Sequence, residues 1–331
     1  MLVKLEFIVG FLLVLIISAS SYFISDNGIL KTFGVSSLIS GVITGIFYGN
    51  SFKVLFPNLF KSSIDFCCKR ILRLAIILYG FNITYQEIVN VGANAVSTSV
   101  IMLTTTFLLV LFLGIKVFKI DKELTLLIAA GASVCGAAAV LAMESQLKSP
   151  PHKTSIAIIT VVLFGTISMF LYPLLMNSEI LPLSPSEYGV YVGSSIHEVA
   201  QVIIATNAVD GASNNAVIVK MTRVLMLPVL LILVGLSCKN KSSKLVIPWF
   251  ALAFLTVGIF NSFNLVNPEI VDKIKFFDKA LLTIAMTALG MSTNLMNVVS
   301  AGLKPIALAT TTFIWLLFGG LAVNIAMIHV F

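Results

Sequence analysis

The chain has 331 residues, of which 58% are hydrophobic and only 11% are charged. Soluble globular domains carry roughly 25% charged residues, so this composition excludes a water-soluble fold. The net charge is +7, but the cations lie mostly in short loops between apolar blocks. That distribution is typical of a membrane protein rather than of a nucleic-acid-binding surface. The composition therefore predicts an all-α integral membrane protein with no catalytic domain outside the membrane.

Apolar blocks of about twenty residues, the length that crosses a roughly 30 Å hydrocarbon core, recur along the chain. They predict a single polytopic membrane domain over residues 1–331 with eleven transmembrane helices. The predicted helices cover residues 5–24, 33–49, 64–82, 91–114, 123–143, 154–176, 186–208, 214–236, 248–264, 279–297 and 305–328. The first block also resembles a signal peptide, but its length and its mixed charges favour a retained helix.

The distribution of Lys and Arg predicts the orientation of these helices. With eleven crossings, twelve Lys and Arg residues collect on the side of the amino terminus and six on the opposite side. Cytoplasmic loops of membrane proteins are enriched in these residues. The amino terminus is therefore expected in the cytoplasm and the carboxyl terminus outside the cell membrane.

Two pairs of segments inside the chain resemble each other. Residues 80–92 match residues 290–302 at both terminal glycines, and residues 131–140 match residues 193–202 at a Gly, a Ser, an Ala and a Val. One explanation is that membrane helices rich in small residues look alike by chance. The other is an internally repeated transporter core, in which substrate sites lie at broken helices near the bilayer midplane.

Ionisable side chains inside the predicted helices are the most informative residues. An Arg, Lys or Asp at the centre of a membrane helix costs about 2.5–3.5 kcal/mol on the insertion scale. Such groups must therefore face a protein-lined or watery interior. The residues concerned are Arg73, Glu198, Lys220 and Arg223, with His197 beside Glu198.

The spacing of these groups predicts a shared polar surface. Lys220 and Arg223 are three residues apart and lie on one face of their helix, as do Ser194 and Glu198, which are four apart. Three cations and one carboxylate give the intramembrane groups a charge of +2, which favours an anion site. The alternative is a structural salt bridge between Glu198 and Lys220 or Arg223.

A run of small residues, 131–139, lies in the middle of the predicted helix 123–143. Small residues allow membrane helices to pack closely. They also allow a helix to unwind locally, which presents free N–H groups and a positive helix end to an anion. Under the second interpretation Ser133, Cys135 and Gly136 line the substrate site.

The sequence from His197 to Gln201 is one residue short of the H-E-x-x-H zinc-protease motif. Gln201 is a poor zinc ligand, so no metal and no other cofactor is expected. His197 is then either a proton carrier near neutral pH or a hydrogen-bonding group between helices. P-loop, G-x-S-x-G and haem motifs are also absent from the sequence, so ATP-driven transport would need a separate subunit. The chain is not expected to be an enzyme.

Several runs are similar to a known family. They cover residues 72–81, 130–136, 193–202, 219–225, 248–250 and 288–291. In this order they resemble the YeiH-like family of bacterial inner-membrane proteins, which carries the label of a sulfate exporter. The resemblance implies a multi-pass carrier with two inverted repeats in the bacterial inner membrane. This chain has Asn82 where the family usually has Arg, which removes the charge at that position.

These features together predict a secondary transporter that exports a small anion, sulfate or a related sulfur oxyanion, with coupling to protons. The expected substrate-binding residues are Arg223, Lys220, Ser133, Cys135, Gly136, Ser194, Ser195 and Arg73. The expected proton-coupling or gating residues are His197, Glu198 and Gln201. The expected partners are the anion and the lipid bilayer, with no nucleic acid, and the sequence is compatible with a homo-oligomer.

Two alternatives remain at this stage. The first is a cation:proton antiporter with the same architecture, in which Glu198 binds the cation and Lys220 or Arg223 is its displaceable partner. The second is a non-transporting membrane protein or an intramembrane enzyme. Stabilisation by sodium instead of an oxyanion would favour the antiporter.

Overall fold

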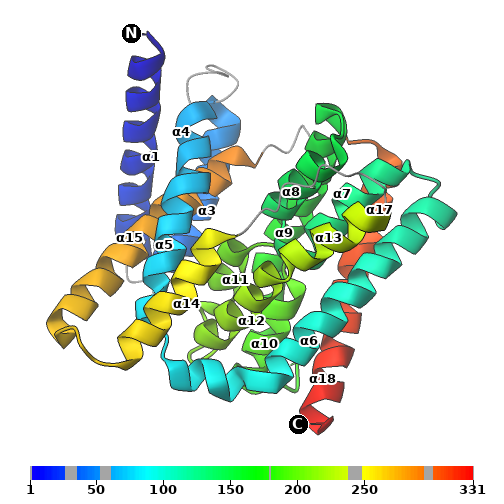
Figure 1. The fold of residues 1–331 in the computed structure, drawn as a ribbon. Coiled ribbons are helices and arrows are strands. Elements are labelled where there is room, and N and C mark those ends of the chain that lie inside the picture. The colour runs from blue at the N-terminus through cyan, green and yellow to red at the C-terminus, as the bar shows by residue number, and fades with distance from the viewer. Residues whose placement is uncertain are drawn as a thin grey trace. The chain divides into compact units, whose positions relative to one another are not determined.

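The computed structural model describes residues 2–26, 36–52, 61–178, 180–237, 248–293 and 301–330, and the regular structure in these residues is helical (Figure 1). The chain divides into two compact units, which are described in turn. Unit 1 comprises Met1–Tyr85 and Phe250–Leu295, and unit 2 comprises Gln86–Trp249 and Met296–Phe331.

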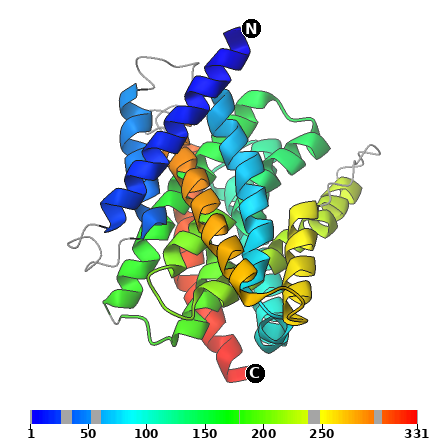
Figure 2. The same cartoon turned by 90° about the vertical axis from the view of Figure 1, so that its left-hand side faces the viewer.

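Unit 1 is built around α15, which packs against α1, α3 and α5 (Figure 2). Its helices are α1 (Leu2–Asp26), α3 (Ser37–Phe52), α4 (Lys61–Phe66), the π-helical turn η1 (Cys67–Ile71), α5 (Leu72–Tyr79), the 3₁₀ turn η2 (Gly80–Asn82), α14 (Trp249–Ser262) and α15 (Pro268–Ser292). A Cβ atom on Gly45 of α3 or on Gly290 of α15 would lie within 3.0 Å of the facing backbone. These glycines therefore let the two helices approach at backbone distance.

Unit 2 contains long helices and several short ones. They are α6 (Tyr85–Phe112), η3 (Leu113–Val117), α7 (Lys122–Ala130), η4 (Gly131–Cys135), α8 (Ala137–Leu147), α9 (Pro151–Asn177), α10 (Pro185–Ser195), α11 (Val199–Thr206), α12 (Ser213–Leu225), α13 (Leu227–Ser237), α17 (Leu303–Ile314), η5 (Trp315–Gly319) and α18 (Gly320–Val330). Helix α6 is kinked at Gly92, whose φ is 39°. Gly302, which directly precedes α17, also has a positive φ.

Five helical stretches among the described residues are long and apolar enough to cross a membrane. They are Glu6–Ser25, Val96–Val117, Pro151–Asn177, Ser213–Leu236 and Leu303–Val330. Each overlaps a block that hydropathy predicts as a membrane helix. The structure thus supports an all-helical membrane protein, and four of these five stretches lie in unit 2.

The predicted membrane helix 123–143 is not one continuous helix. It is interrupted at Gly136, whose φ of 74° and ψ of −136° end one helix and begin the next. Helices α7 and α8 pack against each other, and a Cβ atom on Gly131 would lie within 3.0 Å of the Val140 side chain. Residues nine apart in a straight helix would be about 13 Å apart. The chain therefore reverses direction at Gly136, and we call residues 122–147 hairpin 1.

The predicted membrane helix 186–208 is also a hairpin. Ile196 and Glu198 have extended backbones, with ψ of 149° at both residues, and separate α10 from α11. The hydroxyl of Tyr188, near the start of α10, donates a hydrogen bond of 3.0 Å to the carbonyl of Ala205, near the end of α11. The two helices are therefore antiparallel. We call residues 185–206 hairpin 2.

Helix α9 connects the two hairpins and packs on both. It has 27 residues and is about 40 Å long at 1.5 Å per residue. Gly131 of hairpin 1 lies against Val161, and Gln201 of hairpin 2 lies against Gly165 further along α9. The hairpins therefore enter unit 2 from opposite ends, and their tips point toward each other.

The two ends of unit 2 differ in charge. The end of α6, the base of hairpin 1 and the start of α17 lie together, because Gly114 faces both Thr125 and Leu308. The described residues at this end include Lys116, Lys119, Lys122, Lys148, Lys153 and Lys304. At the other end Asn214 donates to Glu87 and Asn324 to the Glu187 carbonyl. The described residues there include acidic side chains but neither Lys nor Arg.

An ion-pair cluster fixes the base of hairpin 1. Lys153, at the start of α9, donates to the carboxylate of Asp121 at 2.6 Å and to that of Glu123 at 2.8 Å. The hydrogen bond from Lys153 lowers the pKa of Asp121 below its ordinary value. Both ends of hairpin 1 therefore lie at one end of unit 2, whereas eleven crossings would put Lys153 opposite Asp121.

Replacing Lys153 by Met is expected to lower the stability at neutral pH by about 0.2–1 kcal/mol, because exposed pairs contribute little and the Asp121 side chain is 51% exposed. A lowered carboxyl pKa stabilises the fold above the unfolded pKa of about 3.9 and loses that effect as the pH falls through the folded pKa. The difference between wild type and variant in detergent thermal unfolding should therefore fade below about pH 4. A loss that is the same at every pH would contradict this assignment.

Candidate functional site at the hairpin tips

The tips of the two hairpins meet inside unit 2. Gly136, at the tip of hairpin 1, lies so close to Glu198 of hairpin 2 that a Cβ atom would fall within 3.0 Å of the carboxylate side chain. The backbone N–H of Ala137, the first residue of α8, donates to Oε1 of Glu198 at 3.1 Å. The free N–H groups of a helix N-terminus favour a negative charge. The Glu198 carboxylate occupies that position.

Glu198 is also held by its own helix. It precedes α11, and its backbone N–H donates to Oε1 of Gln201 at 3.1 Å. Glu198 is partly exposed on unit 2, as is Ala137, whereas His197 and Gln201 are buried. Glu198 is therefore the least buried of these three polar residues at the tip of hairpin 2.

Lys220 of α12 joins the two tips from the other side. Its side chain is fully buried, and Nζ donates to the carbonyl of Val134 at 2.9 Å and to that of Ile196 at 2.6 Å. These carbonyls end η4 and α10, where the interrupted helices leave them without helical partners. A cation at the C-terminal end of a helix is stabilised by the helix dipole, and Lys220 provides this for two helices at once.

Arg223, one turn further along α12, also donates to backbone carbonyls of both tips. Its Nε donates to the Ser133 carbonyl at 3.1 Å, and Nη2 donates to the carbonyl of Ala132 at 3.3 Å and to that of Ser133. Nη1 donates to the carbonyl of Ser194 at the end of α10. The side chain is fully buried. Because Lys220 and Arg223 are three residues apart, one face of α12 binds both tips.

These contacts change the roles expected of the two cations. The sequence predicts that Lys220 and Arg223 attract an anion directly or form a salt bridge with Glu198. In the structure they donate to backbone carbonyls, and the ion pairs among the described residues do not join either cation to Glu198. A lysine has three N–H donors and an arginine five, so each keeps one N–H in addition to its charge.

Some buried polar atoms at the tips have no hydrogen-bond partner among the described residues. They include Oγ of Ser133, Nδ1 of His197 and Nε2 of Gln201. Buried polar groups are normally paired, and each exception requires an explanation such as a bound ion or water. Their concentration at the tips makes this place a candidate site for a polar ligand or a water molecule.

The structure brings ten of the eleven predicted site residues together. Cys135 and Gly136 end hairpin 1 at its tip, and Ser194 and Ser195 end α10. The exception is Arg73, which lies on α5 of unit 1 with its guanidinium carbon 5.8 Å from the centroid of the Phe250 ring. At the tips themselves the charged groups are therefore Lys220, Arg223 and Glu198.

The free carbonyls of the tips are the site components that the sequence analysis missed, whereas a free N–H at an unwound segment was one of its two interpretations of residues 131–139. The Ala137 N–H and the carbonyls of Val134 and Ile196 bind charged side chains only because the helices are interrupted. A signal for them is present in the sequence, since the similar segments 131–140 and 193–202 are the two hairpin tips.

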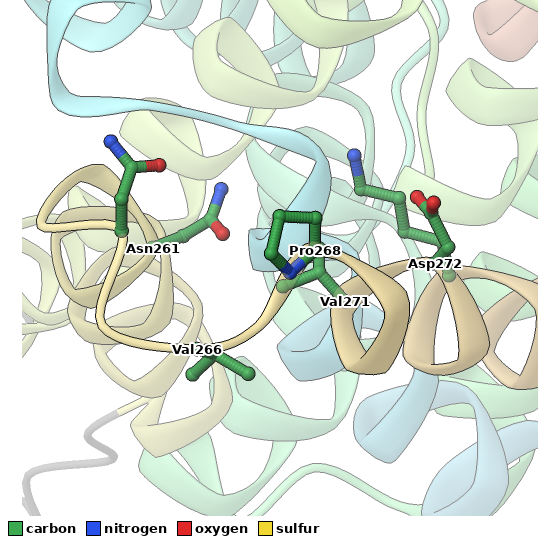
Figure 3. A pocket seen from close by; sticks show the side chains of 7 residues that line it. Asn261, Val266, Pro268, Val271 and Asp272 are labelled. Atoms are coloured by element: carbon green, nitrogen blue, oxygen red, sulfur yellow. The ribbon is translucent and has the colours of Figure 1, made fainter.

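A separate cavity of about 210 Å³ lies in unit 1 at the turn between α14 and α15 (Figure 3). Nδ2 of Asn261 donates to the carbonyls of Phe81 and Ile83 at 3.1 Å each, and the lining residues Asp272 and Lys275 have opposite charges. This amide therefore holds the end of α14 against η2 and the residue that follows it. Among the described residues, no three His, Cys, Asp or Glu side chains are grouped to bind a metal ion.

The apolar helices and the interrupted hairpins define the class of the protein, a helical membrane protein with broken helices in unit 2. The chain belongs to the family whose model is described as "Conserved hypothetical protein 698", which matches residues 9–309. This confirms the resemblance found in the sequence.

Named relatives are similar over most of their length. A UPF0324 membrane protein of Bacteroides thetaiotaomicron is 41% identical over 322 residues, which cover 94% of this chain and 96% of the relative. The UPF0324 inner membrane protein YeiH of Salmonella typhimurium is 43% identical, with 89% of this chain and 87% of the relative covered. The YeiH protein of Escherichia coli K12 is 43% identical, with 88% and 86% covered. No solved structure matches the chain. These names and the apolar helices support a bacterial membrane location.

Proposed function

We propose that the chain is a secondary transporter that moves a small anion across the bacterial inner membrane, with the hairpin tips as its substrate site. The observation that carries this proposal is the meeting of a helix N-terminus, at Ala137, with two buried cations at one point. Lys220 and Arg223 outweigh Glu198 by one charge, which suits an anion. Transport, rather than catalysis, is proposed because the tips are built from broken helix ends, which bind ions in transporters.

The opposite entry of the two hairpins supports transport. Each tip reaches the site from a different end of unit 2, so each hairpin separates the site from one end. Movement of one hairpin at a time would open the site to one side of the membrane. We propose that a hairpin and the helix after it form the repeating element, once as α7–α9 and once as α10–α13 in inverted orientation. The offset of the two similar segments agrees with this repeat.

The lysines of unit 2 support one orientation. Lys and Arg are enriched on the cytoplasmic side, so we propose that the lysine-rich end of unit 2 faces the cytoplasm. Hairpin 1 then enters from the cytoplasm and hairpin 2 from outside. Helix α18 ends at the end without Lys or Arg, which puts the carboxyl terminus outside. If residues 123–143 and 186–208 form hairpins, the number of membrane crossings falls by two and stays odd. We therefore still expect the amino terminus in the cytoplasm.

The test is ligand binding followed by transport. The purified protein is unfolded thermally in detergent with sulfate, sulfite, thiosulfate, phosphate or sodium at constant ionic strength. A ligand at a hundred times its Kd adds about 2.7 kcal/mol to the folded state, and we expect a sulfur oxyanion to do so. The stabilising anion is then tested for uptake into proteoliposomes. Stabilisation by sodium alone would contradict the proposal and favour the cation:proton antiporter.

Ser133→Ala removes the unpartnered hydroxyl at the tip and is expected to weaken anion binding by roughly 10- to 100-fold, the equivalent of one hydrogen bond to a charged group. The matched control is Ser168→Ala, because the Ser168 hydroxyl donates to the Phe164 carbonyl of its own helix. The control should bind the anion as the wild type does. Equal losses in the two variants would show that Ser133 does not contact the anion.

A further inference from the structure

We infer that the carboxylate of Glu198 is a tethered occupant of the anion site, which the substrate anion replaces only when Glu198 takes up a proton. This inference rests on the proposed function and names its coupling. At the N-terminus of α8, protonation of Glu198 comes first and binding of the anion follows.

The geometry at the tips places the carboxylate where an anion would bind. Oε1 of Glu198 accepts a hydrogen bond of 3.1 Å from the Ala137 N–H, at the end of α8 that favours negative charge. Gly136 makes this approach feasible, because a Cβ atom there would collide with the Glu198 side chain. An inorganic oxyanion seeking the same N–H group meets a negative charge already in place.

Two further hydrogen-bond donors at the tips remain available to the substrate anion. Nε2 of Gln201 and the hydroxyl of Ser133 are buried without partners among the described residues. Glu198 binds the backbone but leaves these groups unpaired. An oxyanion has several acceptor oxygens, so it would use these donors together with the Ala137 N–H.

In the part of the chain that the structure describes, few charged or titratable groups lie near Glu198. Lys220 of α12 and Cys135 of η4 interact with it electrostatically, and His197 is its neighbour in the chain. Lys220 is fixed by the carbonyls of Val134 and Ile196. The two carbonyl acceptors favour the charged form of this ammonium group. With Lys220 and Arg223 charged, protonation of Glu198 changes the net charge of these three side chains from +1 to +2.

The expected coupling follows from this charge change. When Glu198 is ionised, like charges disfavour the substrate anion at the tips. When Glu198 binds a proton, the carboxyl loses its charge and its hold on the Ala137 N–H weakens, so the anion takes this donor. One proton then enters the site with each anion.

The experiment measures sulfate binding to the full-length protein between about pH 5 and about pH 8, a range over which sulfate keeps its own charge. The wild type is expected to bind sulfate up to about tenfold more tightly for each unit by which the pH falls. Glu198→Gln keeps an acceptor oxygen for the Ala137 N–H and is expected to bind sulfate with the same affinity throughout. Glu269→Gln, the same substitution at an exposed residue in the first turn of α15 in unit 1, is the matched control and should keep the wild-type pH dependence.

A second measurement needs no variant. Sulfate added to the wild type in weakly buffered solution should cause the uptake of one proton per bound sulfate. Binding of sulfate without pH dependence or proton uptake would overturn the inference and leave the proposed function intact. An unchanged pH dependence in Glu198→Gln would do the same. Absence of binding at every pH in both wild type and Glu198→Gln would overturn both the inference and the proposed sulfate class.

Discussion

Arg223→Met is expected to unfold the chain or to lower its stability by several kcal/mol, because each buried carbonyl left unpaired costs about 1–3 kcal/mol. Arg223 donates to the carbonyls of Ala132, Ser133 and Ser194. Without it these groups are buried and unpaired at the ends of two helices. Thermal unfolding in detergent and size-exclusion chromatography measure the effect.

Arg73→Met is the matched control for this substitution. Arg73 also lies within a predicted membrane helix, but it is exposed on unit 1 and contacts an aromatic ring. A cation–π contact at an exposed site contributes about 0.5–1 kcal/mol, so the control should remain folded. Arg223→Lys keeps the charge but loses the planar group of donors and should fall between the two. An Arg223→Met protein as stable as Arg73→Met would contradict the role of Arg223.

Gly136→Ala is expected to have the second large effect, because two costs add. A residue with a side chain in the left-handed region costs about 1–2 kcal/mol, and at Gly136 the new Cβ atom would also collide with Glu198. Overpacking of this kind adds about 1–3 kcal/mol. The unfolding midpoint in detergent should fall accordingly.

Gly211→Ala separates the two costs. Gly211 has a φ of 83°, and its nearest neighbour would be the Pro185 Cβ atom at 3.9 Å. This variant therefore carries the backbone cost alone. If Gly136→Ala and Gly211→Ala lowered the midpoint equally, the close contact between Gly136 and Glu198 would be contradicted.

Hydropathy predicts which parts of this chain are apolar but not the direction in which they run. Residues 123–143 contain enough apolar residues for a membrane crossing, and the structure uses them for two short antiparallel helices. The reversal depends on the backbone of Gly136, whose positive φ is not visible in a hydropathy profile. The ion pair between Lys153 and Asp121 is evidence of the reversal. A sequence alone does not indicate which lysine pairs with which carboxylate.

The candidate site shows the same division between what is predictable and what is not. The cost of burying charge in a membrane correctly places Lys220 and Arg223 in a protein interior, with the partly exposed Glu198 beside them. It does not predict what the cations bind, because the free carbonyls of Val134 and Ile196 arise only when the helices are interrupted. Composition thus predicts the location of the charges, and the chain reversal decides their partners.

The most direct test of the central claim, that two hairpins enter from opposite ends and meet at the tips, is the side from which their bases are accessible. Single cysteines replace the exposed residues Lys119, Lys148 and Asp210 in a chain whose native cysteines are alanines. A membrane-impermeant maleimide is applied to intact cells and to inverted vesicles. Lys119→Cys and Lys148→Cys should be labelled from the same side of the membrane, and Asp210→Cys from the opposite side. Labelling at positions 119 and 148 from opposite sides would show that residues 123–143 cross the membrane and would contradict hairpin 1.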